Sequence, residues 1–306
     1  MNRCVLALPG AAAAAGRLAT CLAALLGRIE SRRFPDGETY LRVATSVAGS
    51  EAIVVAELRR PDARIPGLLF LADAARELGA SRVGLVAAYL PYMRQDARFR
   101  EGEALTSRSF ARLVGTAFDW LITVDPHLHR YPTLDALYEI PCRVVAAAPA
   151  IAAWVREHVV RPHLVGPDAE SEQWVREVGA LVGCPWTVLQ KQRRGDRDVV
   201  LALPELAGMA GRTPVLVDDI VSSGSTLAAS AQRLCEAGLE APVCIGVHAV
   251  LSAGATDRLA AAGVSRFVTC NTLRHASNAI DITPALAQAV GALGDVGTAA
   301  GPPGVA

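Results

Sequence analysis

The sequence predicts an α/β protein of two domains, each a mainly parallel β-sheet flanked by helices. Short apolar runs alternate along the chain with longer amphipathic stretches, which is the order expected of βαβ units. The runs have no polar face, as expected of strands that are covered by helices on both sides. The length of 306 residues is enough for two hydrophobic cores of ordinary size.

In the first half, residues 5–8 are expected to form a strand, Pro9-Gly10 a turn and residues 11–26 a helix. A secretory signal is the alternative for residues 1–27, although Pro9-Gly10 and Arg17 interrupt the apolar stretch that such a signal needs. Further along, strands are predicted at 52–56, 83–88 and 121–124, and helices at 65–78 and 107–117.

In the second half, strands are predicted at 163–165, 215–217, 243–250 and 266–269, with helices at 151–158, 171–181 and 226–237. A Pro-flanked stretch of small residues at 140–150 separates two halves of similar length. Each half has a strand that ends in a polar loop suited to phosphate, which suggests a duplication of architecture. We expect domains at 1–145 and 146–295, followed by a disordered Gly/Pro/Ala-rich tail at 296–306.

Composition limits the classes of partner. Thirty basic and thirty acidic residues give no net charge, so nothing favours a nucleic acid or a membrane surface. No apolar run reaches about 18 residues, which speaks against a membrane span. The seven cysteines include no C-x-x-C pair and have no zinc-site spacing, as expected of reduced thiols in a cytoplasmic protein.

The strongest local signal is the segment 215–227, VLVDDIVSSGSTL. An apolar run predicts a buried strand, the carboxylates Asp218 and Asp219 follow, and a Ser/Gly-rich loop leads into a helix. Backbone N–H groups and hydroxyls at a helix N-terminus form a site for a monophosphate. The carboxylates would then meet the neutral hydroxyls of a sugar held by its phosphate. A capped helix after an acidic turn is the alternative. The expected phosphate-binding residues are Ser222, Ser223, Gly224, Ser225 and Thr226.

In composition and order this segment resembles the phosphoribosyl pyrophosphate loop of type I phosphoribosyltransferases. Further segments resemble those of ribose-phosphate pyrophosphokinases, and their order and spacing hold over residues 32–227. They are F-P-D-G-E at 34–38, P-Y-M-R-Q-D at 91–96, V-D-P-H at 124–127, G-P-D-A at 166–169 and K-Q-R at 191–193.

The resemblance implies two type I phosphoribosyltransferase-like domains and a transfer of the β,γ-diphosphoryl group of Mg-ATP to the 1-hydroxyl of ribose 5-phosphate. It also implies a homo-oligomer with a shared active site, in which the F-P-D-G-E loop contacts ATP of a neighbouring subunit. The implied catalytic residues are Lys191, Arg193 and His127, and the implied Mg²⁺ ligands are His127 and Asp168. The implied ATP-binding residues are Phe34, Asp36, Glu38, Arg94, Gln95 and Asp96.

The residue types suit this chemistry, because diphosphoryl transfer depends on positioning and on cations aimed at phosphoryl oxygens. Lys191 is the single lysine among thirty basic residues, and its ammonium is a compact point charge where the chain otherwise uses the guanidinium fork. Chance retention of one surface lysine is the alternative. For His127 the alternative is a strand-end histidine bonded to the backbone, since Mg²⁺ usually takes oxygen ligands.

The loop departs from the family pattern at Ser222, Ser223 and Ser225, where aspartate, threonine and glycine are common. Two other classes of function stay open. A phosphoribosyltransferase explains the loop but not the R-Q-D segment, the K-x-R segment or the doubled length. A non-catalytic relative would keep the fold alone, against which the retention of Lys191, Arg193 and His127 argues.

Overall fold

The structure is a computed structural model that describes residues 2–128, 130–189, 193–194, 198–199 and 208–294. Contacts divide the chain into two compact units. The first contains the residues up to Val145 and those from Thr283 on, and the second runs from Ala146 to Ile282. None of the described helices is long and apolar enough to cross a membrane.

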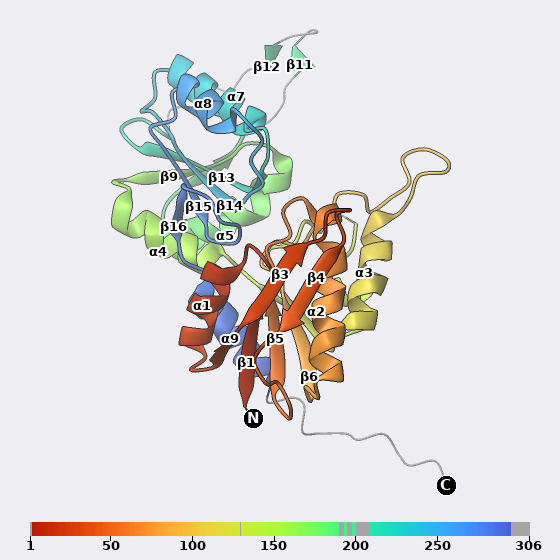
Figure 1. Ribbon diagram of the computed structural model, residues 1–306. Helices are drawn as coiled ribbons and strands as arrows, with labels where there is room; N and C mark the ends of the chain where they lie inside the picture. The colour runs from red at the N-terminus through yellow and green to blue at the C-terminus, as the bar shows by residue number, and fades with distance from the viewer. Residues whose placement is uncertain (1, 129, 190–192, 195–197, 200–207, 295–306) are drawn as a thin grey trace. The chain divides into compact units, whose positions relative to one another are not determined.

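The first unit is built on a six-stranded parallel sheet with the order β2-β1-β5-β6-β7-β8 (Figure 1). Its central strands read as continuous apolar runs such as WLITV, and every residue of that run is buried. Gly84 is required in the neighbouring strand, because a Cβ there would lie 1.9 Å from the ring of Trp120. The strands are β1 (Arg3–Ala7), β2 (Leu25–Gly27), β5 (Glu51–Val55), β6 (Arg82–Val86), β7 (Trp120–Val124) and β8 (Cys142–Val145).

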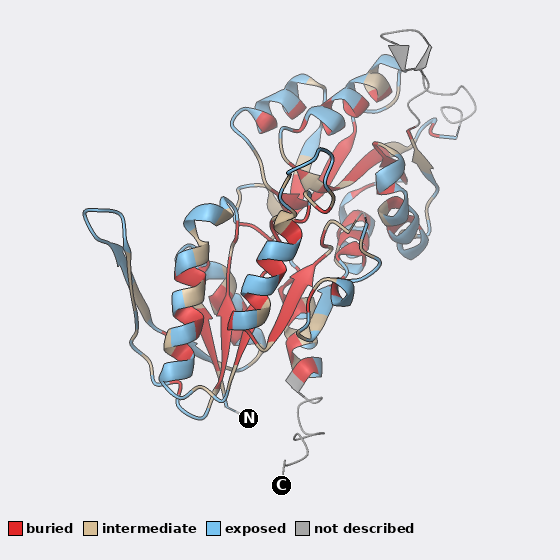
Figure 2. Cartoon of the chain, turned by 90° about the vertical axis from the view of Figure 1, so that its right-hand side faces the viewer, coloured by how far each residue is buried: buried red, intermediate tan, exposed pale blue. Residues whose placement is uncertain are grey.

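The helices of this unit lay buried faces against the sheet and leave their other faces exposed (Figure 2). An antiparallel hairpin of β3 (Ile29–Arg33) and β4 (Thr39–Val43) carries the F-P-D-G-E loop at its tip. The helical segments are α1 (Ala12–Cys21), η1 (Pro61–Ala63), α2 (Ile65–Glu77), α3 (Thr106–Ala117), η2 (Leu134–Ala136) and α9 (Thr283–Gly294).

The second unit has a six-stranded parallel sheet with the order β10-β9-β13-β14-β15-β16. Its strands are β9 (Pro162–Gly166), β10 (Trp186–Val188), β13 (Thr213–Val221), β14 (Val243–Ala249), β15 (Arg266–Cys270) and β16 (Asn278–Ile280). Its helical segments are α4 (Ala148–His158), η3 (Ala169–Ser171), α5 (Glu172–Val182), α7 (Ser225–Glu236) and α8 (Ala255–Ala261). The short strands β11 (Arg193–Arg194) and β12 (Asp198–Val199) pair antiparallel.

Both sheets have the same topology. Numbered along the chain within each sheet, the spatial order is 2-1-3-4-5-6 in either unit. The order reverses between β1 and β5 in the first sheet and between β9 and β13 in the second. Ligands of open α/β sheets bind outside the carboxyl ends of the strands at such switch points. The shared order supports the predicted duplication of architecture, and the predicted α/β class with mainly parallel sheets is confirmed.

Three differences from the sequence-based expectation concern the ends of predicted elements and the domain boundary. The helix expected over 11–26 ends at Cys21, and Ala23, with a φ of 49°, leads into the short strand β2. The strand expected at 215–217 extends through Val221 and includes both aspartates. The helix α9, which falls in the range 146–295 expected for the second domain, packs in the first unit instead.

A pair of arginines explains the position of α9. Arg3 Nη2 donates to the carbonyl of Val290 at 3.5 Å, and Arg82 Nη1 donates to that of Leu293 at 3.4 Å. The last carbonyls of a helix have no partner within the helix and are favourably met by cations. Both arginines belong to strands of the first sheet, so the end of α9 is held there.

Candidate active site

The predicted phosphate loop follows β13 at the switch point of the second sheet. Gly224 has a φ of 73° and forms the N-cap of α7, so the loop turns into the helix in a left-handed conformation that favours glycine. The backbone N–H of Ser225 and the hydroxyls of Ser223 and Ser225 lie at this helix N-terminus, and both serines are exposed. The Oγ atoms of these two serines lie 2.9 Å apart. This geometry suits an anion.

Two contacts that the sequence did not reveal support the loop. Arg258 of α8 donates through Nη1 to the carbonyl of Ser223, and the backbone N–H of Ser252 donates to the carbonyl of Ser222 at 3.1 Å. Arg258 lies 35 residues from its partner, and only the packing of α7 against α8 brings them together. No local pattern marks it. These two contacts fix the backbone of the loop, while the side chains of Ser223 and Ser225 remain exposed.

The two aspartates of β13 differ in environment. Asp219 is buried, and its Oδ1 accepts the backbone N–H of Ile220 at 2.6 Å. Asp218 is half-buried and accepts the N–H of Asp219 at 3.0 Å. Burial is the main cause that raises the pKa of Asp218 to about 8, and the charges of Asp219 and Asp168 raise it further. Near neutral pH, Asp218 can therefore both donate and accept hydrogen bonds, as binding of sugar hydroxyls requires.

Asp168 lies at the carboxyl end of β9, the strand that pairs with β13 across the switch point. Its Oδ1 accepts the N–H groups of Glu170 at 3.1 Å and Ser171 at 3.3 Å, which caps η3. Its charge also acts on Asp218, so the structure brings it to the same edge of the sheet as the phosphate loop. Three carboxylates thus gather beside one anion site.

The first unit places two of the predicted ATP-side segments at one sheet edge. P-Y-M-R-Q-D follows β6, and V-D-P-H follows β7, which is the adjacent parallel strand. His127 is half-buried there, and Arg94 is exposed. Gln95 and Asp96 have structural partners instead of facing solvent. Gln95 accepts from Thr106 and Ser107 at the start of α3, and Asp96 is buried and paired with Arg130 at 2.9 Å.

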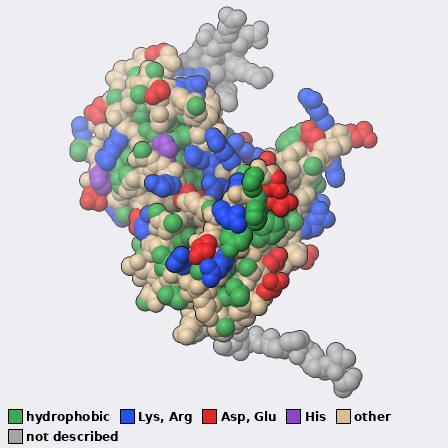
Figure 3. All heavy atoms as spheres, in the orientation of Figure 1, with side chains coloured by type: hydrophobic (Ala, Val, Ile, Leu, Met, Phe, Trp, Pro, Cys, Tyr) green, Lys and Arg blue, Asp and Glu red, His purple; other side chains and the backbone are tan. Residues whose placement is uncertain are grey.

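The F-P-D-G-E segment forms a turn between β3 and β4. The N–H of Gly37 donates to the carbonyl of Phe34 at 2.9 Å, and Asp36 Oδ1 accepts the N–H of Glu38 at 3.1 Å. Phe34 is 38% exposed, and the guanidinium of Arg32 lies 4.5 Å from its ring centroid. Figure 3 shows arginine and hydrophobic side chains side by side on the face of the first unit that carries this hairpin. An aromatic ring beside a cation is available to stack on a base.

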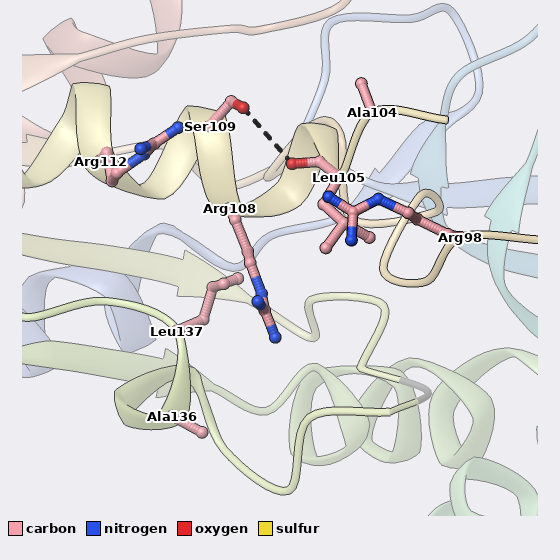
Figure 4. A pocket seen from close by; sticks show the side chains of 8 residues that line it. All are labelled: Arg98, Ala104, Leu105, Arg108, Ser109, Arg112, Ala136 and Leu137. Atoms are coloured by element: carbon pink, nitrogen blue, oxygen red, sulfur yellow. Dashed lines mark hydrogen bonds between the residues drawn. The ribbon is translucent and has the colours of Figure 1, made fainter. Parts of the chain in front are cut away.

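A separate pocket of about 540 Å³ lies beside α3 in the first unit (Figure 4). Three arginines and no acidic residue line it, namely Arg98, Arg108 and Arg112. Figure 4 shows Arg98 and Arg108 reaching toward the space between α3 and the segment of Ala136 and Leu137. The charges favour an anionic occupant. None of the predicted ATP-binding residues lines it, so it is distinct from the P-Y-M-R-Q-D edge.

Several predicted site residues cannot be placed. Lys191 lies outside the described residues, and of Arg193 only the backbone, in β11, is described. His127 belongs to the first unit and Asp168 to the second, so their pairing around one metal ion stays a prediction. Within the described ranges no group of three or more His, Cys, Asp or Glu side chains is positioned to hold a metal ion.

Comparison with known proteins decides the family. Residues 4–117 match the model of the N-terminal domain of ribose phosphate pyrophosphokinase, and residues 134–284 match a phosphoribosyl transferase domain. A ribose-phosphate pyrophosphokinase of Methanopyrus kandleri is 34% identical over 276 residues, which cover 90% of this chain and 94% of that protein. The chain belongs to the ribose-phosphate pyrophosphokinase family.

Two other relatives of the family agree with this assignment. A ribose-phosphate pyrophosphokinase of Halobacterium salinarum is 34% identical over 278 residues, with 90% of this chain and 96% of that protein covered. The crystal structure of phosphoribosylpyrophosphate synthetase from Mycobacterium smegmatis superposes with a TM-score of 0.83 at 25% identity, and covers 97% of this chain and 100% of its own. The chain is thus an enzyme of the ribose-phosphate pyrophosphokinase kind with two phosphoribosyltransferase-type domains, as the sequence predicted.

Proposed function

We propose that this enzyme transfers the β,γ-diphosphoryl group of Mg-ATP to the 1-hydroxyl of ribose 5-phosphate, with phosphoribosyl pyrophosphate and AMP as products. The hydroxyl oxygen attacks the β-phosphorus, and the bond between this phosphorus and the oxygen bridging to the α-phosphorus breaks. AMP leaves with the bridging oxygen, and the hydroxyl proton is released to solvent. The observation that carries the proposal is the second switch point. There an anion site at a helix N-terminus lies beside carboxylates, and the pKa of one of them, Asp218, is raised to about 8.

Each side of the reaction has its own residues in the proposal. Ser222, Ser223, Gly224, Ser225 and Thr226 bind the 5-phosphate of the sugar. Asp218 and Asp219 bind its ring hydroxyls, since carboxyl oxygens accept hydrogen bonds from hydroxyls and a protonated Asp218 can also donate one.

On the nucleotide side, Phe34 stacks on the base, and Asp36 and Glu38 present polar groups to it from an adjacent subunit of a homo-oligomer. Arg94 supplies a fixed cation for the phosphates, while Gln95 holds its segment at the start of α3 and Asp96 pairs with Arg130. Lys191 and Arg193 supply the cations that meet the charge developing on the transferred group.

Magnesium fits the donor set as a phosphate-bound ion. Mg²⁺ commonly keeps several waters and takes one or two carboxylates together with substrate phosphates. Asp168 has an oxygen, Oδ2, beyond the Oδ1 that caps η3, and His127 is the second residue that we propose near the ion. When bound, Mg²⁺ neutralises phosphate charge. The enzyme's own residues bind and orient the two substrates.

The test is release of AMP from Mg-ATP with and without ribose 5-phosphate, in the wild-type enzyme and in Lys191→Ala and Lys191→Arg. We expect AMP only when the sugar phosphate is present. Loss of a cation aimed at the transferring group lowers kcat by about 100-fold or more in Lys191→Ala. Lys191→Arg should recover only part of it, because a guanidinium is not a point charge. Unchanged kcat in Lys191→Ala would remove Lys191 from the mechanism, and absence of AMP would favour a non-catalytic relative.

A further inference from the structure

The turn of residues 59–64 (RRPDAR) connects β5 to α2 and contains η1. It lies at the carboxyl edge of the first sheet and is closed by hydrogen bonds within the turn. Arg64 donates from its backbone N–H to the carbonyl of Pro61 at 2.8 Å and from Nε to that of Arg59 at 3.0 Å. Its Nη1 also donates to the carbonyl of Pro9 at 2.6 Å, which fastens the turn to the loop after β1.

This turn contacts the P-Y-M-R-Q-D segment through Asp62. The hydroxyl of Tyr92 donates to Asp62 Oδ1, and the ring of Tyr92 lies 5.2 Å from that of Phe110. Tyr92 has a φ of 64°, a left-handed conformation that is unfavourable for an aromatic residue and persists only where surrounding contacts impose it. Tyr92 stands two positions before Arg94, so its backbone conformation sets the direction in which the chain runs into Arg94.

The same turn contacts the hairpin that carries F-P-D-G-E. Arg33 donates from Nη2 to the carbonyl of Ala63 at 3.3 Å and from Nη1 to the carbonyl of Gly37, inside the hairpin loop, at 2.7 Å. One guanidinium thus joins the loop to the turn. Two segments that are about 55 residues apart in sequence meet the same short element.

We propose that the 59–64 turn is a positioning element for two nucleotide-binding segments. Asp62 fixes Tyr92, and thereby Arg94, for the site of its own subunit, while Arg33 ties the turn to the F-P-D-G-E hairpin, which on the proposed function serves the site of the adjacent subunit. The inference rests on the proposed function, because it assumes that Arg94 meets the phosphates of ATP. Asp62 and Tyr92 touch no reacting atom in this account. They act through the backbone of residues 92–96.

The ionisation of the pair is compatible with this role. Partial burial, followed by the hydrogen bond and the charge of Asp62, raises the pKa of Tyr92 to about 12. The phenol therefore stays a donor throughout the physiological range, and the contact does not depend on pH there. The effect of breaking this contact on KM for ATP should therefore be the same from pH 6 to pH 9. A constant effect would distinguish the pair from Asp218, whose pKa is raised to about 8.

The test is a double-mutant cycle in the full-length enzyme with Tyr92→Phe, Asp62→Ala and the double variant. The matched control is Tyr138→Phe, which removes a buried hydroxyl that has no hydrogen-bond partner within the described part of the chain. Steady-state kinetics are measured with ATP and with ribose 5-phosphate varied in turn. Hydrogen exchange of the amides of residues 92–96 is followed in parallel, without substrates.

Each single variant should raise KM for ATP about five-fold, which corresponds to one net hydrogen bond, while KM for ribose 5-phosphate and kcat stay within about two-fold. The double variant should be no worse than either single one, because both remove the same contact. Exchange at 92–96 should become faster in Tyr92→Phe and Asp62→Ala and stay unchanged in Tyr138→Phe.

Unchanged KM for ATP and unchanged exchange would overturn the inference, as would additive effects in the double variant or equal changes for both substrates. The proposed function fails separately, namely if the wild-type enzyme releases no AMP in the presence of ribose 5-phosphate. In that case hydrogen exchange alone decides whether Asp62 and Tyr92 hold the segment.

Discussion

Asp218 is the residue of the proposed ribose 5-phosphate site whose pKa is strongly raised. It lies in a strand next to Asp219 and within reach of the charge of Asp168, and burial together with these two charges raises its pKa to about 8. An ordinary surface aspartate would be fully ionised at neutral pH. The elevated pKa therefore keeps an acceptor and donor of hydrogen bonds where a sugar is proposed to bind, at a cost to the stability of the substrate-free protein.

The pH dependence of stability follows from the sign of this shift. In the unfolded chain the carboxyl loses its proton near its ordinary pKa of 3.8, whereas in the folded chain it keeps the proton up to about pH 8. Between these values the folded state binds more protons, so the free energy of unfolding falls as pH rises, by at most about 1.4 kcal/mol per pH unit. Asp218→Asn should remove this decline.

Urea unfolding at pH 5 and pH 8 checks this prediction, with exposed Asp73→Asn as the matched control. At pH 8, Asp218→Asn should be more stable than the wild type, while its KM for ribose 5-phosphate should rise about ten-fold through the altered hydrogen bonds. Equal pH dependence in wild type and Asp218→Asn would contradict the elevated pKa.

At the scale of elements, a buried ion-pair cluster ties four strands of the first sheet together. Glu51 of β5 is 1% exposed and accepts from Arg3 Nε of β1 and Trp120 Nε1 of β7, each at 3.0 Å. Arg82 of β6 lies 3.8 Å from the same carboxylate. Because Arg3 and Arg82 also reach the last turn of α9, one carboxylate organises both the sheet and the helix that closes the unit.

Glu51→Ala should cost about 3–5 kcal/mol of unfolding free energy, because it leaves two partly buried guanidinium groups without their counterion. Glu30→Ala is the matched control, since Glu30 pairs with Arg28 and Arg42 at the surface and its loss should cost about 1 kcal/mol or less. Denaturant midpoints measure both. Similar losses of unfolding free energy in the two variants would show that the buried ion pairs of Glu51 stabilise the fold no more than the surface pairs of Glu30.

The elements also show what a single sequence could and could not predict. A continuous apolar run such as that of β7 marks a buried strand by itself, and the phosphate loop is marked by its Asp, Ser and Gly content. The three-residue strands β2, β10 and β16 are too short to show a hydrophobic pattern. The strand predicted at 215–217 is shorter than β13 because Asp218 and Asp219 interrupt the apolar run.

Side chains that act across the fold could not be found in this way. Arg258 and Asp62 are 35 and 30 residues from the groups that they hold, and nothing in their local sequence points to these partners. The position of α9 depends in part on Arg3 of β1 and Arg82 of β6, the strands on either side of β5, which are more than 200 residues away in sequence. Such contacts arise only when the parallel strands bring distant segments to one edge.

At the scale of the whole molecule, the chain leaves the first unit at Val145 and returns to it at Thr283. The predicted ATP-side segments lie in the first unit and the ribose-phosphate loop in the second. On the proposed function neither unit holds a complete site. The repeated strand order indicates how such an enzyme can divide two substrates between two copies of one architecture.

A chain that ends at Ile282 should lose the stability of the first unit while the second keeps its sheet. The deletion removes the buried side chains of Leu286, Val290 and Leu293, each worth about 1.5–3 kcal/mol, and their sum is comparable to the stability of a domain. A chain that ends at Gly294 is the matched control. Hydrogen exchange resolved by residue should show loss of protection in β1, β5 and β7 only in the shorter chain. Full protection there would assign α9 no structural role.

The central claim is that a diphosphoryl group moves as one unit from ATP to the sugar. Phosphorus NMR of the products formed from Mg-ATP and ribose 5-phosphate tests it most directly, because it identifies both the nucleotide released and the bond that is made. We expect AMP together with a diphosphate ester on the anomeric carbon, in equal amounts and only when ribose 5-phosphate is present. ADP with a sugar monophosphate ester, or AMP with free pyrophosphate from the first turnover, would contradict it.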